Sequence, residues 1–332
     1  LRYAFRVVNY ETMNLSTWNL SNVTSMHGLF SGNNVSETFN PIGVSNWNVS
    51  GVKDFQECFN GSELVGVDNL RVDATSWNVT SATNLQNMFG NCYNFNQDIG
   101  SWNVNNVVFF NNMFNCTVQH GNFNQDLDTW NVSSGTHFET MFRNQINFNG
   151  STANWDFTGV KSSFGSTMNS MFVNSNNFNG NVAGWKLPAQ VISVFGNCDS
   201  FTGIGTETWD LTNVNTLQNV FMDSAFNNDI STWNVAGVTS MHGLFANCSE
   251  FNQDISSWNV QNVTTFRTTF KGASKFNQDI SNWDPISATN LSNMFENAIV
   301  FDSNMDTFIA TAESNNTVNK TDMFLGATAY NS

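Results

Sequence analysis

The chain has 332 residues, of which 14% are aromatic and only 11% are charged. This aromatic content excludes an intrinsically disordered chain, which is poor in such residues. The net charge of −15 repels phosphate groups, so we expect neither nucleic acid nor an anionic membrane surface as a partner. No apolar run reaches the roughly 18 residues that a membrane span needs, so we expect no membrane insertion.

From its start, the chain repeats a short unit. Residues 1–9 read as a partial N-terminal unit, and three aromatic positions then recur in phase. The first series is Trp18, Trp47, Trp77, Trp102, Trp130, Trp155, Trp185, Trp209, Trp233, Trp258 and Trp283. The second, usually twelve residues after the tryptophan, is Phe30, Phe59, Phe89, Phe114, Phe142, Phe172, Phe195, Phe221, Phe245, Phe270, Phe295 and Phe324. The third opens FNQD-like segments, as at Phe95, Phe123, Phe226, Phe251 and Phe276.

We interpret each unit as a short strand followed by a short helix. The QDIS segment of FNQDISSWNVQNVTTF (251–266) fits a brief strand bounded by polar residues. After the Asn–Val pair, apolar residues stand at i, i+3 and i+4, as in Met26, Leu29 and Phe30, which is typical of a helix. Units this small must stack to bury their apolar side chains. The expected fold class is therefore α/β, a leucine-rich-repeat-like right-handed solenoid of about twelve units of about 25 residues.

The repeats predict one continuous domain over residues 1–332. Residues 301–332 are a degenerate C-terminal unit in which Phe308 stands where a tryptophan is expected. Tyr330 occupies the place of the phenylalanine that opens another repeat. Both ends thus fall inside a unit, which would leave strand edges and aromatic core uncovered, and on this ground we expect head-to-tail self-association.

The strings WNLSNVTSMHGLF (18–30) and FNNDISTWNVAGVTSMHGLF (226–245) resemble the BspA-like leucine-rich-repeat family. That family includes repeats of unknown function in mycoplasma surface lipoproteins and in protist and algal surface proteins. The resemblance covers roughly residues 10–332. It implies a leucine-rich-repeat-like fold, a cell-surface or secreted location and, in bacteria, adhesion to host matrix proteins. It carries over no catalytic residue.

The aspartates of consecutive FNQD-like segments form a candidate calcium site. Asp229, Asp254 and Asp279 would stack one unit apart, where their carboxylates repel one another. A Ca²⁺ ion held between carboxylate and carbonyl oxygens would relieve that repulsion. The simpler alternative is that each exposed aspartate accepts a local backbone N–H and is screened by salt. No other cofactor is expected.

Five cysteines lack the CxxC spacing of a zinc site. Cys92 and Cys116 follow the core phenylalanines of adjacent units, so their Cα atoms could lie within the reach of a disulfide. Cys58 occupies a core position and is expected to be a buried thiol.

Many Asn-x-Ser/Thr sequons are candidate glycosylation sites in a secreted protein. We expect those in extended loops to be modified: Asn34, Asn60, Asn115, Asn149, Asn315 and Asn319. The asparagines directly after the tryptophans also stand in sequons at Asn19, Asn48, Asn78 and Asn131. Those are interpreted as turn caps, less accessible to a transferase.

The sequence contains no P-loop, HExxH or GxSxG motif, so we expect no catalytic or cofactor-binding residues and no enzyme. The leading hypothesis is an extracellular or cell-surface structural repeat protein that assembles end to end into a fibre or sheath. The alternative is a surface adhesin that binds a protein or glycan through its repeat face.

Overall fold

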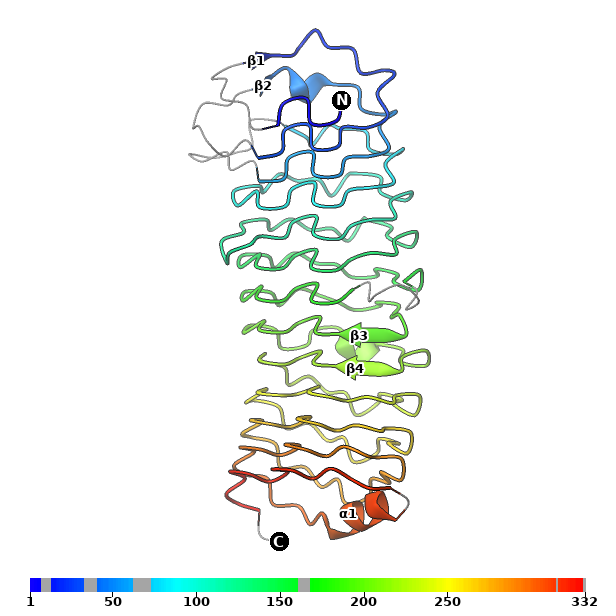
Figure 1. Ribbon diagram of the computed structural model, residues 1–332, viewed down its shortest axis with the longest axis vertical. Coiled ribbons are helices and arrows are strands. Elements are labelled where there is room, and N and C mark those ends of the chain that lie inside the picture. Colours follow the sequence, from blue (N-terminus) through cyan, green and yellow to red (C-terminus); the bar gives the residue numbers. More distant parts are fainter. Residues whose placement is uncertain (7–12, 33–40, 62–72, 161–167, 315, 331–332) are drawn as a thin grey trace.

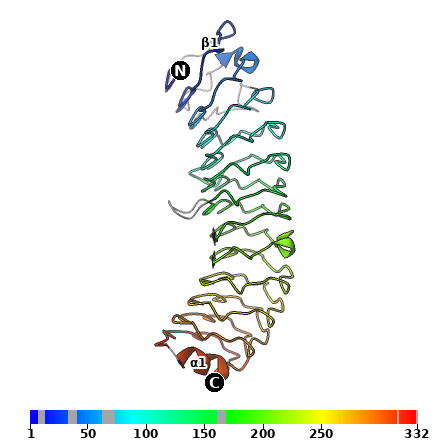
Figure 2. The same ribbon diagram turned by 90° about the vertical axis from the view of Figure 1, so that its right-hand side faces the viewer.

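The chain winds into a tall, narrow column of stacked turns, with its N-terminal and C-terminal units at opposite ends (Figure 1). In this computed structural model the described residues are 1–6, 13–32, 41–61, 73–160, 168–314 and 316–330. Each unit of the sequence makes one layer of the column. Viewed from the side, the layers follow one another without a break between domains, and the column is gently bent (Figure 2).

Regular secondary structure is sparse in the described part of the chain. Two pairs of parallel strands are found, each with its partner on the next layer. The elements are β1 (Met13–Asn14), β2 (Pro41–Ile42), the 3-10 helix η1 (Val44–Asn46), β3 (Gln190–Ile192), the 3-10 helix η3 (Thr206–Thr208), β4 (Thr216–Gln218) and the α-helix α1 (Asp306–Glu313).

The expected leucine-rich-repeat-like solenoid, with a strand and a helix in every unit, is wrong. Among the described residues, α1 is the one α-helix, and the strands are two or three residues long. The reason lies in the direction of the backbone hydrogen bonds. The N–H groups of Phe55, Glu57 and Phe59 donate to the carbonyls of the next layer, at 2.9, 2.9 and 3.0 Å, instead of to their own chain four residues earlier.

A left-handed residue inside the presumed helix also interrupts it. Asn87, midway between Leu85 and Phe89, has φ of 53°, a conformation that glycine and short polar residues adopt most readily. The same place in other layers is left-handed at Gly28, Glu57, Asn112, Thr140, Ser170, Ser193, Asn219, Gly243, Thr268 and Asn293. The i, i+3, i+4 spacing therefore marks a succession of tight turns whose apolar side chains all point inward.

Layers are joined in parallel register by single-residue bridges. One run passes through Ser25, Asp54, Asn84, Phe109 and His137, each paired with the next. A second run continues from Thr216 through Ser240, Thr265, Asn290 and Asn319. Backbone pairing thus follows one side of the column, although few residues extend it into a formal strand.

Aromatic rings fill the interior. Every tryptophan from Trp47 to Trp283 is less than a tenth exposed. Rings of neighbouring layers stack face to face, as for Phe59 and Phe89, whose centroids are 5.7 Å apart at an interplanar angle of 1°. Such offset stacking adds to the stabilisation from burial alone. The aromatic series of the sequence are therefore the core of the column.

The C-terminal unit keeps this core although its backbone differs. Phe308 lies on α1 and is fully buried, with its ring centroid 6.5 Å from that of Trp283. It therefore takes the tryptophan place that the sequence assigns to it. No helix in the described ranges is long and apolar enough to cross a membrane.

Candidate functional site

The polar residues that recur in each unit join one layer to the next. In the FNQD segment from Phe276, the Asn277 N–H donates to Oδ1 of Asn252 at 2.9 Å. Nε2 of Gln278 donates to both the carbonyl oxygen and Oδ1 of Asn252, each at 2.9 Å. Gln253 and Gln125 hold Asn227 and Asn96 in the same way. These repeated amides are therefore structural, and a functional site is better sought where the repeat changes.

The aspartates expected to hold calcium each close a turn of their own. Oδ1 of Asp229, Asp254 and Asp279 accepts the backbone N–H of the serine two residues later, at 2.9 Å in every case. Hydrogen bonds from the backbone and hydroxyl of Ser231 lower the pKa of Asp229. In the part of the chain that is described, no three His, Cys, Asp or Glu residues come together to hold a metal ion. The geometry matches the turn-capping alternative, and a calcium ion stays a prediction.

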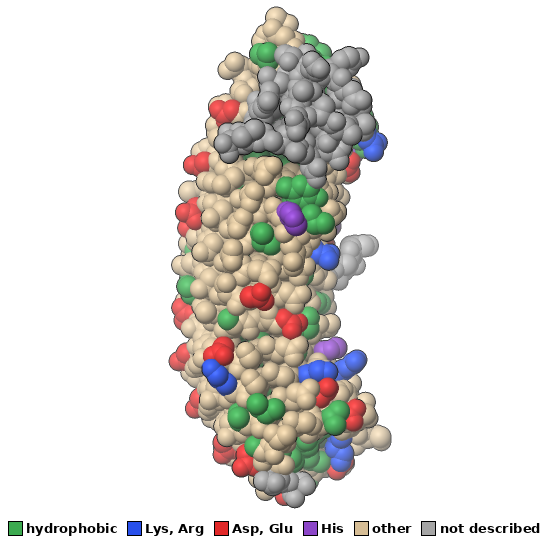
Figure 3. Space-filling view, turned by 90° about the vertical axis from the view of Figure 1, so that its left-hand side faces the viewer, with side chains coloured by type: hydrophobic (Ala, Val, Ile, Leu, Met, Phe, Trp, Pro, Cys, Tyr) green, Lys and Arg blue, Asp and Glu red, His purple; other side chains and the backbone are tan. Residues whose placement is uncertain are grey.

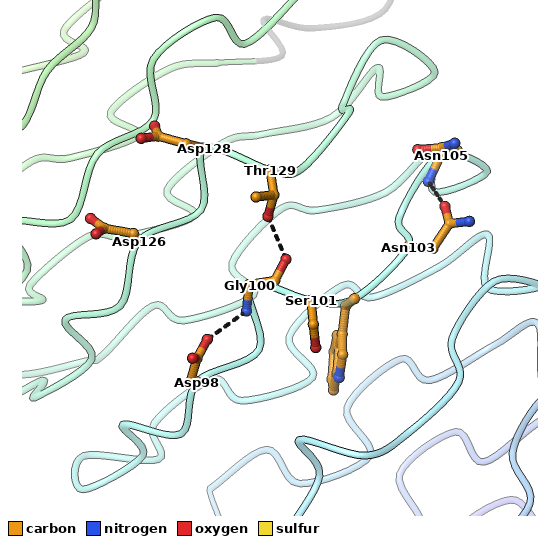
Figure 4. Close-up of a pocket in the computed structure, with 9 residues that line it drawn as sticks. Asp98, Gly100, Ser101, Asn103, Asn105, Asp126, Asp128 and Thr129 are labelled. Carbon is orange, nitrogen blue, oxygen red and sulfur yellow. Dashed lines mark hydrogen bonds between the residues drawn. The ribbon is translucent and has the colours of Figure 1, made fainter.

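A shallow pocket of about 530 Å³ opens between two layers on the side of the column (Figure 4). Its lining mixes apolar surface, such as that of Trp102, with polar side chains that include three exposed carboxylates. The lining residues are Asp98, Gly100, Ser101, Trp102, Asn103, Asn105, Asp126, Asp128 and Thr129. They belong to the turns on either side of Trp102 and before Trp130.

Local hydrogen bonds fix the walls of this pocket. Oδ1 of Asp98 accepts the N–H of Gly100 at 3.0 Å, and the Thr129 hydroxyl donates to the Gly100 carbonyl (Figure 4). Oδ1 of Asp126 and Oδ1 of Asp128 accept N–H groups of the following layer, each at 2.9 Å. Each carboxylate thus uses one oxygen to hold the fold, and its second oxygen accepts no hydrogen bond from the described residues. The pocket suits hydroxyl or ammonium groups, which donate hydrogen bonds to carboxylates.

Two of the residues that line the pocket depart from the repeat. Gly100 and Asp128 stand where other units have a serine, as at Ser231 and Ser256. A Cβ atom added to Gly100 would lie only 2.9 Å from the carbonyl oxygen of Asp126, so the two layers meet too closely there for a side chain. Reading the sequence did not reveal this pocket, although the glycine in place of a serine was the available signal.

Cys92 and Cys116 do not form a disulfide, because their thiols are engaged elsewhere. All five cysteines are buried and are present as thiols. Sγ of Cys92 donates to the carbonyl of Phe59 at 3.0 Å, toward the preceding layer. Sγ of Cys116 accepts from Nε2 of Gln145 at 3.2 Å, from the following layer. Burial raises the pKa of Cys116 to about 12, and Cys58 is fully buried as expected.

The six sequons expected in loops have different surroundings. Asn60 and Asn115 are half-buried: Oδ1 of Asn60 accepts from Nδ2 of Asn91 at 3.4 Å, and Nδ2 of Asn115 donates to Oδ1 of Asn112 at 3.2 Å. Asn149 and Asn319 are exposed. Asn34 and Asn315 lie outside the described residues.

Few large apolar side chains of the described residues are exposed, and they include Val118, Ile204 and Leu325. The face in Figure 3 is mostly backbone and uncharged polar side chains, with acidic groups scattered along its length. Stacked layers, a continuous aromatic core and a polar exterior together define an elongated tandem-repeat protein.

A family model matches the chain in four overlapping stretches, over residues 1–121, 64–185, 189–308 and 222–332. The chain belongs to this family, which is described as Mycoplasma protein of unknown function, DUF285. Overlapping matches agree with a unit that recurs along the whole column. Comparisons with curated proteins and with solved structures gave no match.

Proposed function

We propose that this protein is a structural repeat protein of the cell surface or the extracellular space, without enzymatic activity. The observation that carries the proposal is the use of the repeated polar residues. The asparagine, glutamine and tryptophan polar atoms of the unit bond to neighbouring layers, as Gln278 does to Asn252 and Trp258 to Ile230. The repeat therefore serves to build a long column.

End-to-end assembly into a fibre or sheath is part of this proposal. Layers are joined through parallel bridges that need no feature peculiar to one unit, as the run from Thr216 to Asn319 illustrates. The same bonding between two copies would extend the column, and such a head-to-tail contact propagates. A terminal face that bonds to another copy would also have its backbone groups satisfied.

Composition supports the location. The acidic, lysine-poor surface rich in asparagine, serine and threonine suits a secreted protein. The likeness of WNLSNVTSMHGLF (18–30) to BspA-like repeats, which occur in surface proteins, favours the same place.

Negative-stain electron microscopy of the purified native protein, with and without EDTA, tests the assembly. Filaments are the expected result, and their loss in EDTA would support calcium at Asp229, Asp254 and Asp279. Single short rods at micromolar concentration in both conditions would contradict end-to-end assembly.

A surface adhesin is the second candidate, and the pocket beside Gly100 is the observation that favours it. Hydroxyl groups of a glycan, or basic side chains of a protein, would meet the free carboxylate oxygens there. Binding to a panel of glycans and extracellular proteins should weaken in Asp128→Ser, which restores the repeat residue. Asp254→Ser, outside the pocket, is the matched control. Equal binding by both variants would show that the pocket does not bind the ligand.

A further inference from the structure

Four asparagines that directly follow a tryptophan share one position in the unit and one environment. Asn19, Asn48, Asn78 and Asn131 are all exposed. Each stands in an Asn-x-Ser/Thr sequon, completed by Ser21, Ser50, Thr80 and Ser133. The sequence predicts that these asparagines cap turns and are poorly accessible to a transferase. The structure confirms that they cap turns, but it shows that their side chains are exposed.

The turn orients the side-chain amide. Oδ1 of Asn48 accepts the N–H of Ser50 at 3.1 Å, and the equivalent distances at Asn19, Asn78 and Asn131 are 2.9, 3.1 and 3.1 Å. Because the oxygen faces the backbone, Nδ2 lies on the opposite side of the planar amide. No hydrogen bond among the described residues involves Nδ2 of these four asparagines. The attachment atom for an N-linked glycan is therefore presented to solvent at each of them.

The half-buried sequons differ in this respect. Nδ2 of Asn115 already donates a hydrogen bond, and Oδ1 of Asn115 is a buried acceptor with no partner. The Asn60 amide faces the next layer, where Oδ1 would be 3.0 Å from a Cβ atom placed on Gly90. A sugar on either side chain would displace inter-layer or turn contacts. A sugar on the tryptophan-following asparagines would displace none.

We propose that Asn19, Asn48, Asn78 and Asn131 form an N-glycosylation row along one edge of the column. An oligosaccharyltransferase would use an oligosaccharide carried on a polyprenyl pyrophosphate. The C1–O bond to the pyrophosphate breaks as a bond forms between C1 and Nδ2. The amide loses one proton, and the lipid pyrophosphate leaves. The inference rests on the proposed surface or extracellular location, because that route brings the chain to the transferase.

The row ends part-way along the column. The equivalent positions farther on are Asp156, Lys186, Asp210, Asn234, Asn259 and Asp284, none of which stands in a sequon. Asn103 lacks a hydroxyl residue two positions later as well. Glycans on the row would therefore line one edge between residues 19 and 131, and the tryptophan-following position would carry none from residue 156 to residue 284.

The test uses the full chain with a cleavable secretion signal, translated into microsomes and also secreted from a eukaryotic host. Glycosidase release in ¹⁸O water followed by peptide mass spectrometry reads the occupancy of each site. We expect the four row sites to be occupied and Asn60 and Asn115 to be much less so. Ser50→Ala and Ser133→Ala should each remove one glycan, because alanine lacks the hydroxyl group that completes the sequon. Alanine keeps the backbone N–H, so the turn itself is retained.

Ala236→Ser supplies the matched gain of a site. The Ala236 N–H already donates to Oδ1 of Asn234 at 3.2 Å, so the turn exists without the hydroxyl. This variant should gain one glycan at Asn234, seen as a shift of one glycan mass in microsomes irrespective of folding.

An unmodified row, with or without glycans at Asn60 and Asn115, overturns the proposal. Because the secretion signal imposes the route, this result would not bear on the native location. Failure of the proposed location would appear separately, as native protein recovered only from the cell interior.

Discussion

Each core tryptophan is held at its ring and at its indole nitrogen. Trp258 stacks on the tryptophans of both neighbouring layers, and its Nε1–H donates to the carbonyl of Ile230 at 3.2 Å. The same donation recurs at Trp102, Trp130, Trp209 and Trp283. One side chain thus supplies apolar area and also satisfies a buried carbonyl.

Replacing the tryptophan should lower the free energy of unfolding by an amount that depends on whether the ring, the indole N–H or both are lost. Trp258→Ala should lower the free energy of unfolding by about 3–5 kcal/mol, because it leaves a cavity between two stacked rings. Trp258→Phe keeps a ring but leaves the Ile230 carbonyl without the indole donor, a loss of about 1–3 kcal/mol. Urea unfolding followed by circular dichroism measures both. Thr232→Ala, at an exposed position, is the control; an equal effect there would contradict the assignment.

The buried cysteines should not react with alkylating reagents in the folded protein. Burial raises the pKa of Cys116 and of Cys248 to about 12, and the thiolate is the reactive form. We expect no alkylation by iodoacetamide at pH 8 in the native state and complete alkylation in denaturant, measured by intact mass. Ser249→Cys, at an exposed position next to Cys248, should react in the native state. Rapid native labelling of the wild-type chain would show that the layers open.

Turns are the elements of this fold, and their left-handed residues determine the path of the chain. At Asn87, φ is 53° while its N–H donates to the carbonyl of Asn111 at 3.1 Å. The left-handed conformation lets the N–H groups of Leu85 and Phe89, two residues to either side, point to the next layer as well. A regular helix would leave those carbonyls of the neighbouring layer unpaired.

A β-branched residue at this position should strain the turn. Asn87→Val should reduce the free energy of unfolding by about 1–2 kcal/mol or more, because the left-handed region is closed to such side chains. Asn87→Gly should be close to neutral, since glycine adopts positive φ freely. Thermal unfolding of the two variants decides between them. If valine and glycine proved equivalent, the left-handed turn would not be a determinant of stability.

At the scale of the whole molecule, the exposed aspartates Asp229, Asp254 and Asp279 predict the response to acid, because their pKa values are shifted. Hydrogen bonds from the serines lower the pKa of Asp229, Asp254 and Asp279 in the folded state. A depressed folded pKa contributes stability above the unfolded value, near 3.9, and that contribution is lost as the pH falls through the folded pKa. Stability should therefore fall below about pH 4, while solubility is lowest near the isoelectric point of 4.3.

The melting temperature measured from pH 7 to pH 2 tests this expectation. Asp279→Asn keeps an oxygen acceptor for the Ser281 N–H but cannot titrate, so its melting temperature should decline less steeply than that of the wild-type chain. A melting temperature that does not fall between pH 4 and pH 2 would contradict this contribution of the turn hydrogen bonds.

Several properties of the column could be predicted from the sequence. The spacing of tryptophan and phenylalanine identified the repeat and its core, because aromatic residues recurring in phase must share one environment. Phe308 was placed correctly in the tryptophan column for the same reason, although it lies on a helix. The asparagines after the tryptophans were recognised as turn caps, because their hydrogen bonds reach only two residues along the chain.

Other properties depended on contacts between layers. Apolar residues at i, i+3 and i+4 fit a helix and a series of tight turns equally well. The chain forms tight turns because its N–H groups donate to carbonyls of the next layer, as the Phe55 N–H does to the Asn84 carbonyl. In the same way, Cys92 is directed toward the Phe59 carbonyl of the preceding layer, and the pocket is lined by residues of two layers. The sequence by itself determined the repeat and which side chains are buried, whereas only the tertiary structure decided the backbone conformation, the thiol partners and the exposed amides, because those depend on residues one full layer away.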